Sequence, residues 1–65
     1  MKYIHETPQA TLEVQMVDDA EIGVLRVFIE GDRGIKPLYT GLDKKEAKRV
    51  YEQVVIALKK SLEEG

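Results

Sequence analysis

The sequence predicts an α+β fold, in which a three-stranded antiparallel β-meander packs against one C-terminal α-helix. Between residues 11 and 40, short segments alternate apolar and polar side chains, as half-buried strands do. Polar or glycine-containing turns separate these segments. Residues 43–63 instead repeat apolar side chains at helical spacing. A chain of 65 residues has the size of one small domain, and we expect residues 1–65 to form one.

The first strand of the meander is predicted at Thr11–Val17. Leu12, Val14 and Met16 fall on one face of it, with polar side chains between them. The polar residues 18–21 that follow are typical of a turn. This strand therefore has one face suited to a core and one suited to solvent.

The second strand is predicted at Ile22–Glu30, where β-branched and aromatic residues form a long run. Apolar residues occur on both of its faces, which is typical of a central strand. One face carries Leu25, Val27 and Ile29, and the other carries Val24, Arg26 and Phe28.

A glycine-containing turn at residues 31–34 leads to a third strand at residues 35–40. Pro37 restricts that strand to the edge of the sheet, because proline has no N–H to donate to a neighbour. Residues 1–10 form either an arm or a fourth edge strand around Tyr3–His5, which Pro8 would end.

The helix at residues 43–63 has both a start signal and an apolar stripe. Asp43 has the position of an N-cap, and Glu46 three residues later completes a capping box. Leu42 and Ala47 have the spacing of a hydrophobic staple. We expect the stripe to pack on the sheet face that carries Leu25. Its members are Ala47, Val50, Tyr51, Val54, Leu58 and Leu62.

The composition argues against an enzyme. The chain has no cysteine, which excludes disulfides, thiolate zinc sites and cysteine nucleophiles. Its single histidine, His5, lies near the N-terminus, where we expect a solvated side chain without the fixed geometry that catalysis needs. The acidic residues at 18–21 lack the length and spacing of an EF-hand loop. We therefore predict no catalytic residue, no metal site and no cofactor.

A small chain without disulfides commonly gains stability from a partner, because it buries only about 60% of its unfolded surface. The sheet face turned away from the helix should carry Val17, Val24, Phe28 and one or both of Ile35 and Tyr39. On the helix, Ile56 lies opposite the apolar stripe. We therefore predict a homodimer. The residues expected at its interface are Val24, Phe28, Tyr39 and Ile56.

Charge is unevenly distributed along the chain. Residues 1–25 hold one lysine and five acidic residues, a net charge of −4, whereas residues 26–60 hold nine Lys or Arg and five acidic residues, a net charge of +4. The start of the helix is basic, although the helix dipole favours acids there. Free amides and basic side chains suit a phosphate, so a nucleic-acid-binding module is the alternative function. Its contacts would come from Lys44, Lys45, Lys48 and Arg49 together with Arg26, Arg33 and Lys36.

Two short segments resemble nucleic-acid-binding families. Gly41–Ala47, which follows the three strands, resembles the strand-to-helix junction in the arm-binding domains of phage and transposon integrases. Arg26–Leu42, with Gly34–Pro37 ahead of a terminal helix, is loosely similar to the coactivator type of single-strand-binding fold. Both resemblances imply a basic, aromatic sheet that contacts nucleic acid.

No apolar run approaches the roughly 20 residues needed to span a bilayer, and no signal-peptide pattern follows the N-terminus. We expect a cytoplasmic protein that makes no membrane contact. The favoured function is a small interaction or regulatory protein that acts as a homodimer and has no enzymatic activity.

Overall fold

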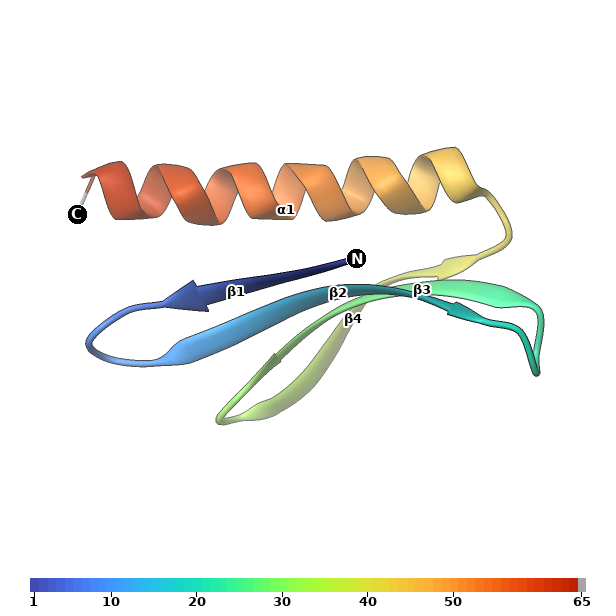
Figure 1. Cartoon of the computed structure of the whole chain (residues 1–65), viewed down its shortest axis with the longest axis horizontal. Coiled ribbons are helices and arrows are strands. Elements are labelled where there is room, and N and C mark those ends of the chain that lie inside the picture. The colour runs from blue at the N-terminus through green and yellow to red at the C-terminus, as the bar shows by residue number, and fades with distance from the viewer. Residues whose placement is uncertain (65) are drawn as a thin grey trace.

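A four-stranded antiparallel sheet and one helix make up the computed structural model of the chain (Figure 1). The structure describes residues 1–64, with side chains as far as Glu63. The strands follow one another across the sheet in the order β1-β2-β3-β4, and the helix comes last. This confirms the α+β class and the C-terminal helix. The elements are β1 (Lys2–Glu6), β2 (Thr11–Asp19), β3 (Val24–Gly31), β4 (Gly34–Gly41) and α1 (Lys44–Glu64).

The N-terminal residues form a strand, so the second of the two alternatives for residues 1–10 is correct. Strand β1 pairs antiparallel with β2, which places His5 opposite Leu12. A tight turn joins the two strands: the Thr7 amide donates to the Ala10 carbonyl (2.9 Å), and the Ala10 amide donates to the Thr7 hydroxyl (3.1 Å). Pro8 lies in this turn, beyond the end of β1, as its missing N–H predicts.

The turn between β2 and β3 comes later in the chain than the sequence indicated. Strand β2 continues to Asp19, and β3 begins only at Val24. Gly23 adopts a φ of 68° and its amide donates to the Asp19 carbonyl at 2.8 Å, which closes the turn. The prediction that Ile22 belongs to the strand was therefore wrong; Ile22 lies in the turn and is 65% exposed.

A β-bulge in the edge strand β4 decides where Tyr39 lies. Val27 pairs with Tyr39 and Phe28 pairs with Pro37, so Leu38 is the extra residue. Strict alternation would put Tyr39 on the same face as Ile35, but the bulge turns it to the other face. Leu38 and Tyr39 both pack against the core under the helix. Of Ile35 and Tyr39, one or both of which were predicted to share a face with Phe28, only Ile35 does, and the prediction of Tyr39 as an interface residue on that face was wrong.

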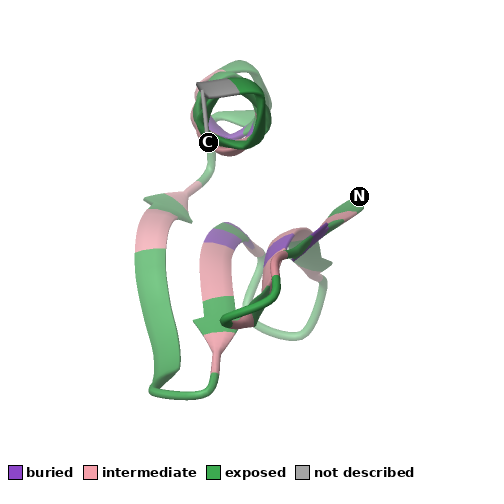
Figure 2. Ribbon diagram, turned by 90° about the vertical axis from the view of Figure 1, so that its left-hand side faces the viewer, coloured by how far each residue is buried: buried purple, intermediate pink, exposed green. Residues whose placement is uncertain are grey.

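The core lies between the helix and the middle strands, and it is small. Helix α1 covers one face of the sheet (Figure 2). The chain exposes 4936 Å², whereas a compact monomer of this mass exposes about 4,200 Å². Its radius of gyration of 12.4 Å also exceeds the roughly 11 Å of a compact chain of this length. The buried hydrophobic residues are Val14, Leu25, Val27, Ala47 and Tyr51.

The start of α1 is capped differently from the prediction. Asp43 is the N-cap, because its Oδ1 accepts the amides of Lys45 (3.0 Å) and Glu46 (3.2 Å). The capping box is not formed: the Asp43 amide donates to the Tyr39 hydroxyl instead of to Glu46. There is no hydrophobic staple either, since Leu42 is 77% exposed while Ala47 is buried.

Candidate functional site

The sheet face turned away from α1, here called the open face, is the first candidate surface. Strand register places alternate residues of all four strands on it, and no other element of the described chain covers it. Phe28 lies near its middle, opposite Gln15 on one side and Pro37 on the other. The Arg26 guanidinium lies over the Phe28 ring at 5.9 Å from its centre. The apolar side chains of the open face are Ile4, Val17, Val24, Phe28 and Ile35.

Acidic side chains interrupt this apolar surface. Glu13 and Glu30 lie opposite each other on β2 and β3. The Lys2 ammonium lies 3.7 Å from the Glu13 carboxylate, and the Gln15 amide donates to that carboxylate at 3.2 Å. The open face therefore mixes apolar side chains with charged ones, some of which are already paired within the face. Such a surface suits contact with a protein better than contact with a polyanion.

The structure separates the residues predicted for a dimer interface. Val24 and Phe28 belong to the open face, whereas Tyr39 lies under the helix. Ile56 is 61% exposed on α1, which covers the opposite face of the sheet. These four residues therefore belong to at least two surfaces, and only Val24 and Phe28 among them lie together on the open face.

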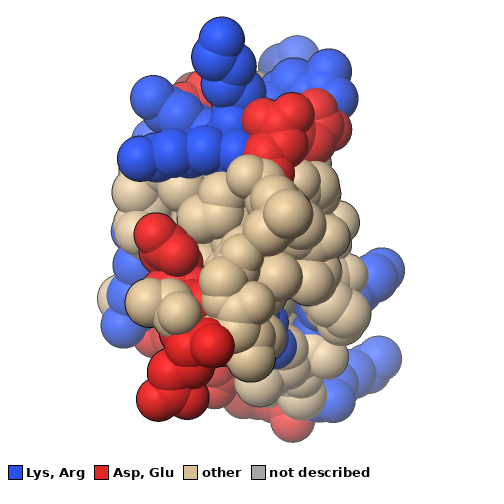
Figure 3. Space-filling model, turned by 90° about the vertical axis from the view of Figure 1, so that its right-hand side faces the viewer, with Lys and Arg blue, Asp and Glu red and all other residues tan. Residues whose placement is uncertain are grey.

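The residues predicted for anion binding are also separated. Arg26 lies on the open face opposite Val17, whereas Lys36 lies opposite Ile29 on the helix side of the sheet. Arg33 is in the turn between β3 and β4. The remaining cations lie at the start of α1, at the other end of β4, where Figure 3 shows Lys and Arg gathered over the helix.

The start of α1 offers a phosphate less than the sequence suggested. The Asp43 carboxylate already occupies the amides of Lys45 and Glu46. Arg49 donates to the Glu46 carboxylate at 2.6 Å, and this hydrogen bond and the attraction between the charges raise the pKa of Arg49 above its ordinary value. Lys44, Lys45 and Lys48 remain exposed, with no carboxylate within ion-pair distance among the described residues.

His5 is buried, which corrects the prediction of a solvated side chain. Pairing of β1 with β2 places it on the helix side of the sheet, where it is 5% exposed. Its Nδ1 has no hydrogen-bond partner within the described part of the chain. The Tyr3 ring lies 6.2 Å away, and the Lys59 ammonium lies over that ring at 5.4 Å. The signal available in the sequence was the alternative of an edge strand around Tyr3–His5, in which Tyr3 and His5 would share one face and Ile4 would lie on the other.

Within residues 1–64, no group of three or more His, Asp or Glu side chains is arranged to hold a metal ion. In the same residues, no helix is both long and apolar enough to cross a bilayer.

Comparisons with known proteins give no match: none was found among protein-family models, curated proteins or solved structures.

Proposed function

We propose that this protein is a non-enzymatic interaction protein that acts as a homodimer through the open face of its sheet. The observation that carries the proposal is the cluster of apolar side chains around Phe28 on this face: Phe28 is itself partly exposed, and Ile4, Val17 and Ile35 are exposed. Ile35, for example, is 61% exposed on this face. Burying such side chains is worth about 25 cal/mol per Å² of apolar surface.

The surface area of the chain supports this proposal. The 4936 Å² that the chain exposes exceed the expectation for a compact monomer by roughly 700 Å². A stable interface of ordinary size buries about 800 Å² on each partner. A twofold dimer of sheet faces would therefore remove an area close to the excess.

The charges of the open face are compatible with a second copy. Arg26 has no carboxylate partner among the described residues, and Glu30 on the same strand has no cation. In a twofold interface, each side chain can face its complement on the other copy, because both partners present the same patch. A nucleic acid would instead have to approach Glu13 and Glu30, which repel phosphates.

Measurement of the mass in solution tests this proposal. We expect sedimentation or light scattering to give a dimer for the wild-type protein and a monomer for Phe28→Glu. Ile35→Glu should have the same effect, and its side chain is so exposed that folding is not at risk. Ile56→Glu is the matched control on the helix and should remain a dimer.

Two results would overturn the proposal. A monomeric wild-type protein at every accessible concentration would remove self-association altogether. Dissociation by Ile56→Glu, with Phe28→Glu and Ile35→Glu still dimeric and folded, would move the interface to the helix.

A further inference from the structure

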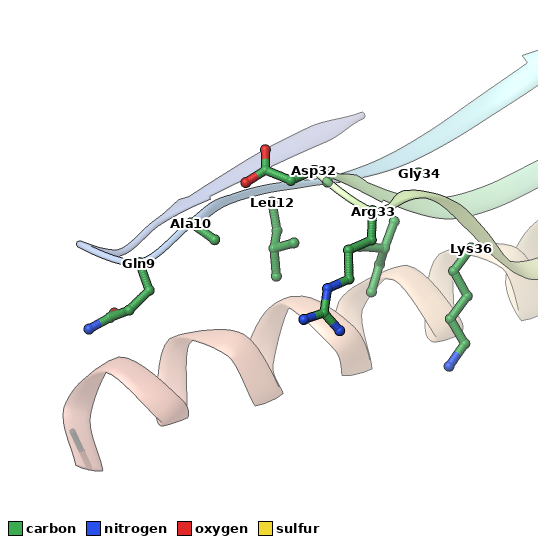
Figure 4. Close-up of a pocket in the computed structure, with 9 residues that line it drawn as sticks. Gln9, Ala10, Leu12, Asp32, Arg33, Gly34 and Lys36 are labelled. Carbon is green, nitrogen blue, oxygen red and sulfur yellow. The ribbon is translucent and has the colours of Figure 1, made fainter.

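A groove lies on the helix side of the sheet, between the β1–β2 turn, which supplies Gln9 and Ala10, and the β3–β4 hairpin (Figure 4). It has a volume of about 540 Å³, within the range of small-molecule sites, about 300–1,000 Å³. We call it the hairpin groove. It is distinct from the open face, because register places Leu12, Ile29 and Lys36 on the opposite side of the sheet. The residues that line it are Gln9, Ala10, Leu12, Ile29, Gly31, Asp32, Arg33, Gly34 and Lys36.

The floor of the hairpin groove is apolar. Leu12 and Ile29 come from the central strands β2 and β3, yet both remain partly exposed. Gly31 and Gly34 pair with each other at the end of the hairpin and add no side chain to this side. Leu12 lies over Gly31, since a Cβ added at Gly31 would come within 2.7 Å of the Leu12 Cδ2.

Two cationic side chains, Arg33 and Lys36, lie next to this apolar floor. Figure 4 shows the Arg33 and Lys36 side chains on the same side of the strands as Leu12, extending toward the helix. Neither has a carboxylate within ion-pair distance in the part of the chain that the structure describes. The groove therefore combines an apolar surface with two positive charges that lack a partner.

The charged residues at the tip of the hairpin point to different sides of the sheet. The Asp32 carboxylate points away from Arg33 and Lys36 (Figure 4). On the other side, Asp32 lines a shallow depression together with Glu13 and Glu30. At the tip of the hairpin, the Asp32 carboxylate therefore lies at the rim of the groove and points away from it, whereas Arg33 and Lys36 extend along the groove side.

We propose that the hairpin groove binds a small anionic amphiphile, with its apolar body on Leu12 and Ile29 and its carboxylate at Arg33 and Lys36. A ligand of this class makes both kinds of contact that the groove offers. A neutral chain would form no ion pair with Arg33 and Lys36, and a small polar anion would not cover Leu12 and Ile29. The volume of the groove favours a single free molecule, such as a medium-chain carboxylate, over a membrane surface.

An NMR titration with decanoate below its micelle concentration tests the site. The methyl groups of Leu12 and Ile29 should shift in a saturable manner, while those of Val24 on the open face should not. Decanol and decyltrimethylammonium carry chains of the same length without the negative charge. Both should bind about three- to tenfold more weakly than decanoate, because exposed charge contacts contribute modestly.

Variants distinguish the effect of the two cations in the groove from the effect of the net charge of the protein. Arg33→Gln/Lys36→Gln should weaken decanoate about three- to tenfold. Lys44→Gln/Lys48→Gln is the matched control, since it removes the same charge from the start of α1, and it should leave the affinity unchanged. Both pairs are exposed, so both variants should fold.

Three outcomes would overturn the proposal. The first is the absence of saturable shifts at Leu12 and Ile29. The second is equal affinity for decanoate and its cationic analogue. The third is binding to anionic phosphatidylglycerol vesicles without binding to monomeric decanoate, which would assign the cations to a membrane surface.

Discussion

The phenol ring of Tyr39 lies directly over the backbone of Gly41. A Cβ added at Gly41 would come within 2.5 Å of the Tyr39 hydroxyl oxygen and 2.9 Å of Cζ. From this position the hydroxyl accepts the Asp43 amide at 3.2 Å and donates to the Asp43 carbonyl at 3.4 Å. The bulge in β4, the missing side chain at Gly41 and the helix cap are therefore parts of one arrangement that joins the sheet to α1.

Gly41→Ala should destabilise the protein by about 1–3 kcal/mol, because a rigid ring has to move to admit the new methyl group. Urea unfolding followed by circular dichroism would measure the change. Gly31→Ala is a matched control: its Cβ would clash with the terminal methyl of Leu12, which can rotate away, and would lie at an ordinary contact distance of 3.8 Å from the Thr11 carbonyl oxygen. Equal costs for the two variants would show that the Tyr39 ring is not held in place.

Removal of the Tyr39 hydroxyl should weaken the start of the helix. We expect Tyr39→Phe to cost about 0.5–1.5 kcal/mol, the contribution of an ordinary hydrogen bond. Asp43→Ala should cost about 0.5–2 kcal/mol through loss of the N-cap. Because both residues stabilise the same turn, their effects in the double variant should not add. Strict additivity in urea unfolding would contradict this coupling.

His5 should be replaceable by an apolar residue. A buried polar atom without a partner costs about 1–3 kcal/mol, so His5→Leu should leave the free energy of unfolding unchanged or raise it. His5→Gln retains a polar group at the same position and should be less stable than His5→Leu. The prediction fails if His5→Leu is the less stable of the two, because that result would mean that Nδ1 makes a stabilising hydrogen bond.

Nucleic-acid binding should be weak and non-specific. The exposed lysines at the start of α1 can attract phosphates, but the other predicted contacts lie on other surfaces. We expect fluorescence anisotropy with single- and double-stranded DNA to show affinity only at low salt, and Lys44→Ala/Lys45→Ala/Lys48→Ala to remove it. Binding tighter than about 1 µM at physiological salt, beyond the usual non-specific range, would favour the alternative function.

Periodicity in the sequence was sufficient for most of the fold. The alternation from Thr11 to Val17 and the apolar run that ends near Glu30 identified two strands, and the spacing of Ala47, Tyr51 and Val54 identified the helix and its buried side. Asp43 as N-cap was also correct. These features depend on residues close together in the chain, and local patterns report them directly.

The positions of single functional side chains were less predictable. His5 was expected in solvent because its burial depends on whether β1 pairs with β2, which is a contact between distant residues. Tyr39 was misplaced because one extra residue in a strand reverses the face of every residue that follows it. Arg33 and Lys36 were grouped with the lysines of the helix start, although the length of β4 separates them.

The sequence by itself determined that residues 11–17 and the run ending near Glu30 are strands, that a helix follows at the C-terminus, and which side of each of these meets the core, because the repeat of apolar residues matches the repeat of the backbone. Only the tertiary structure decided which apolar and charged side chains remain uncovered together. The pairing of all four strands brings the β1–β2 turn and the β3–β4 hairpin to the same end of the sheet, where their side chains line one groove that no local pattern encodes.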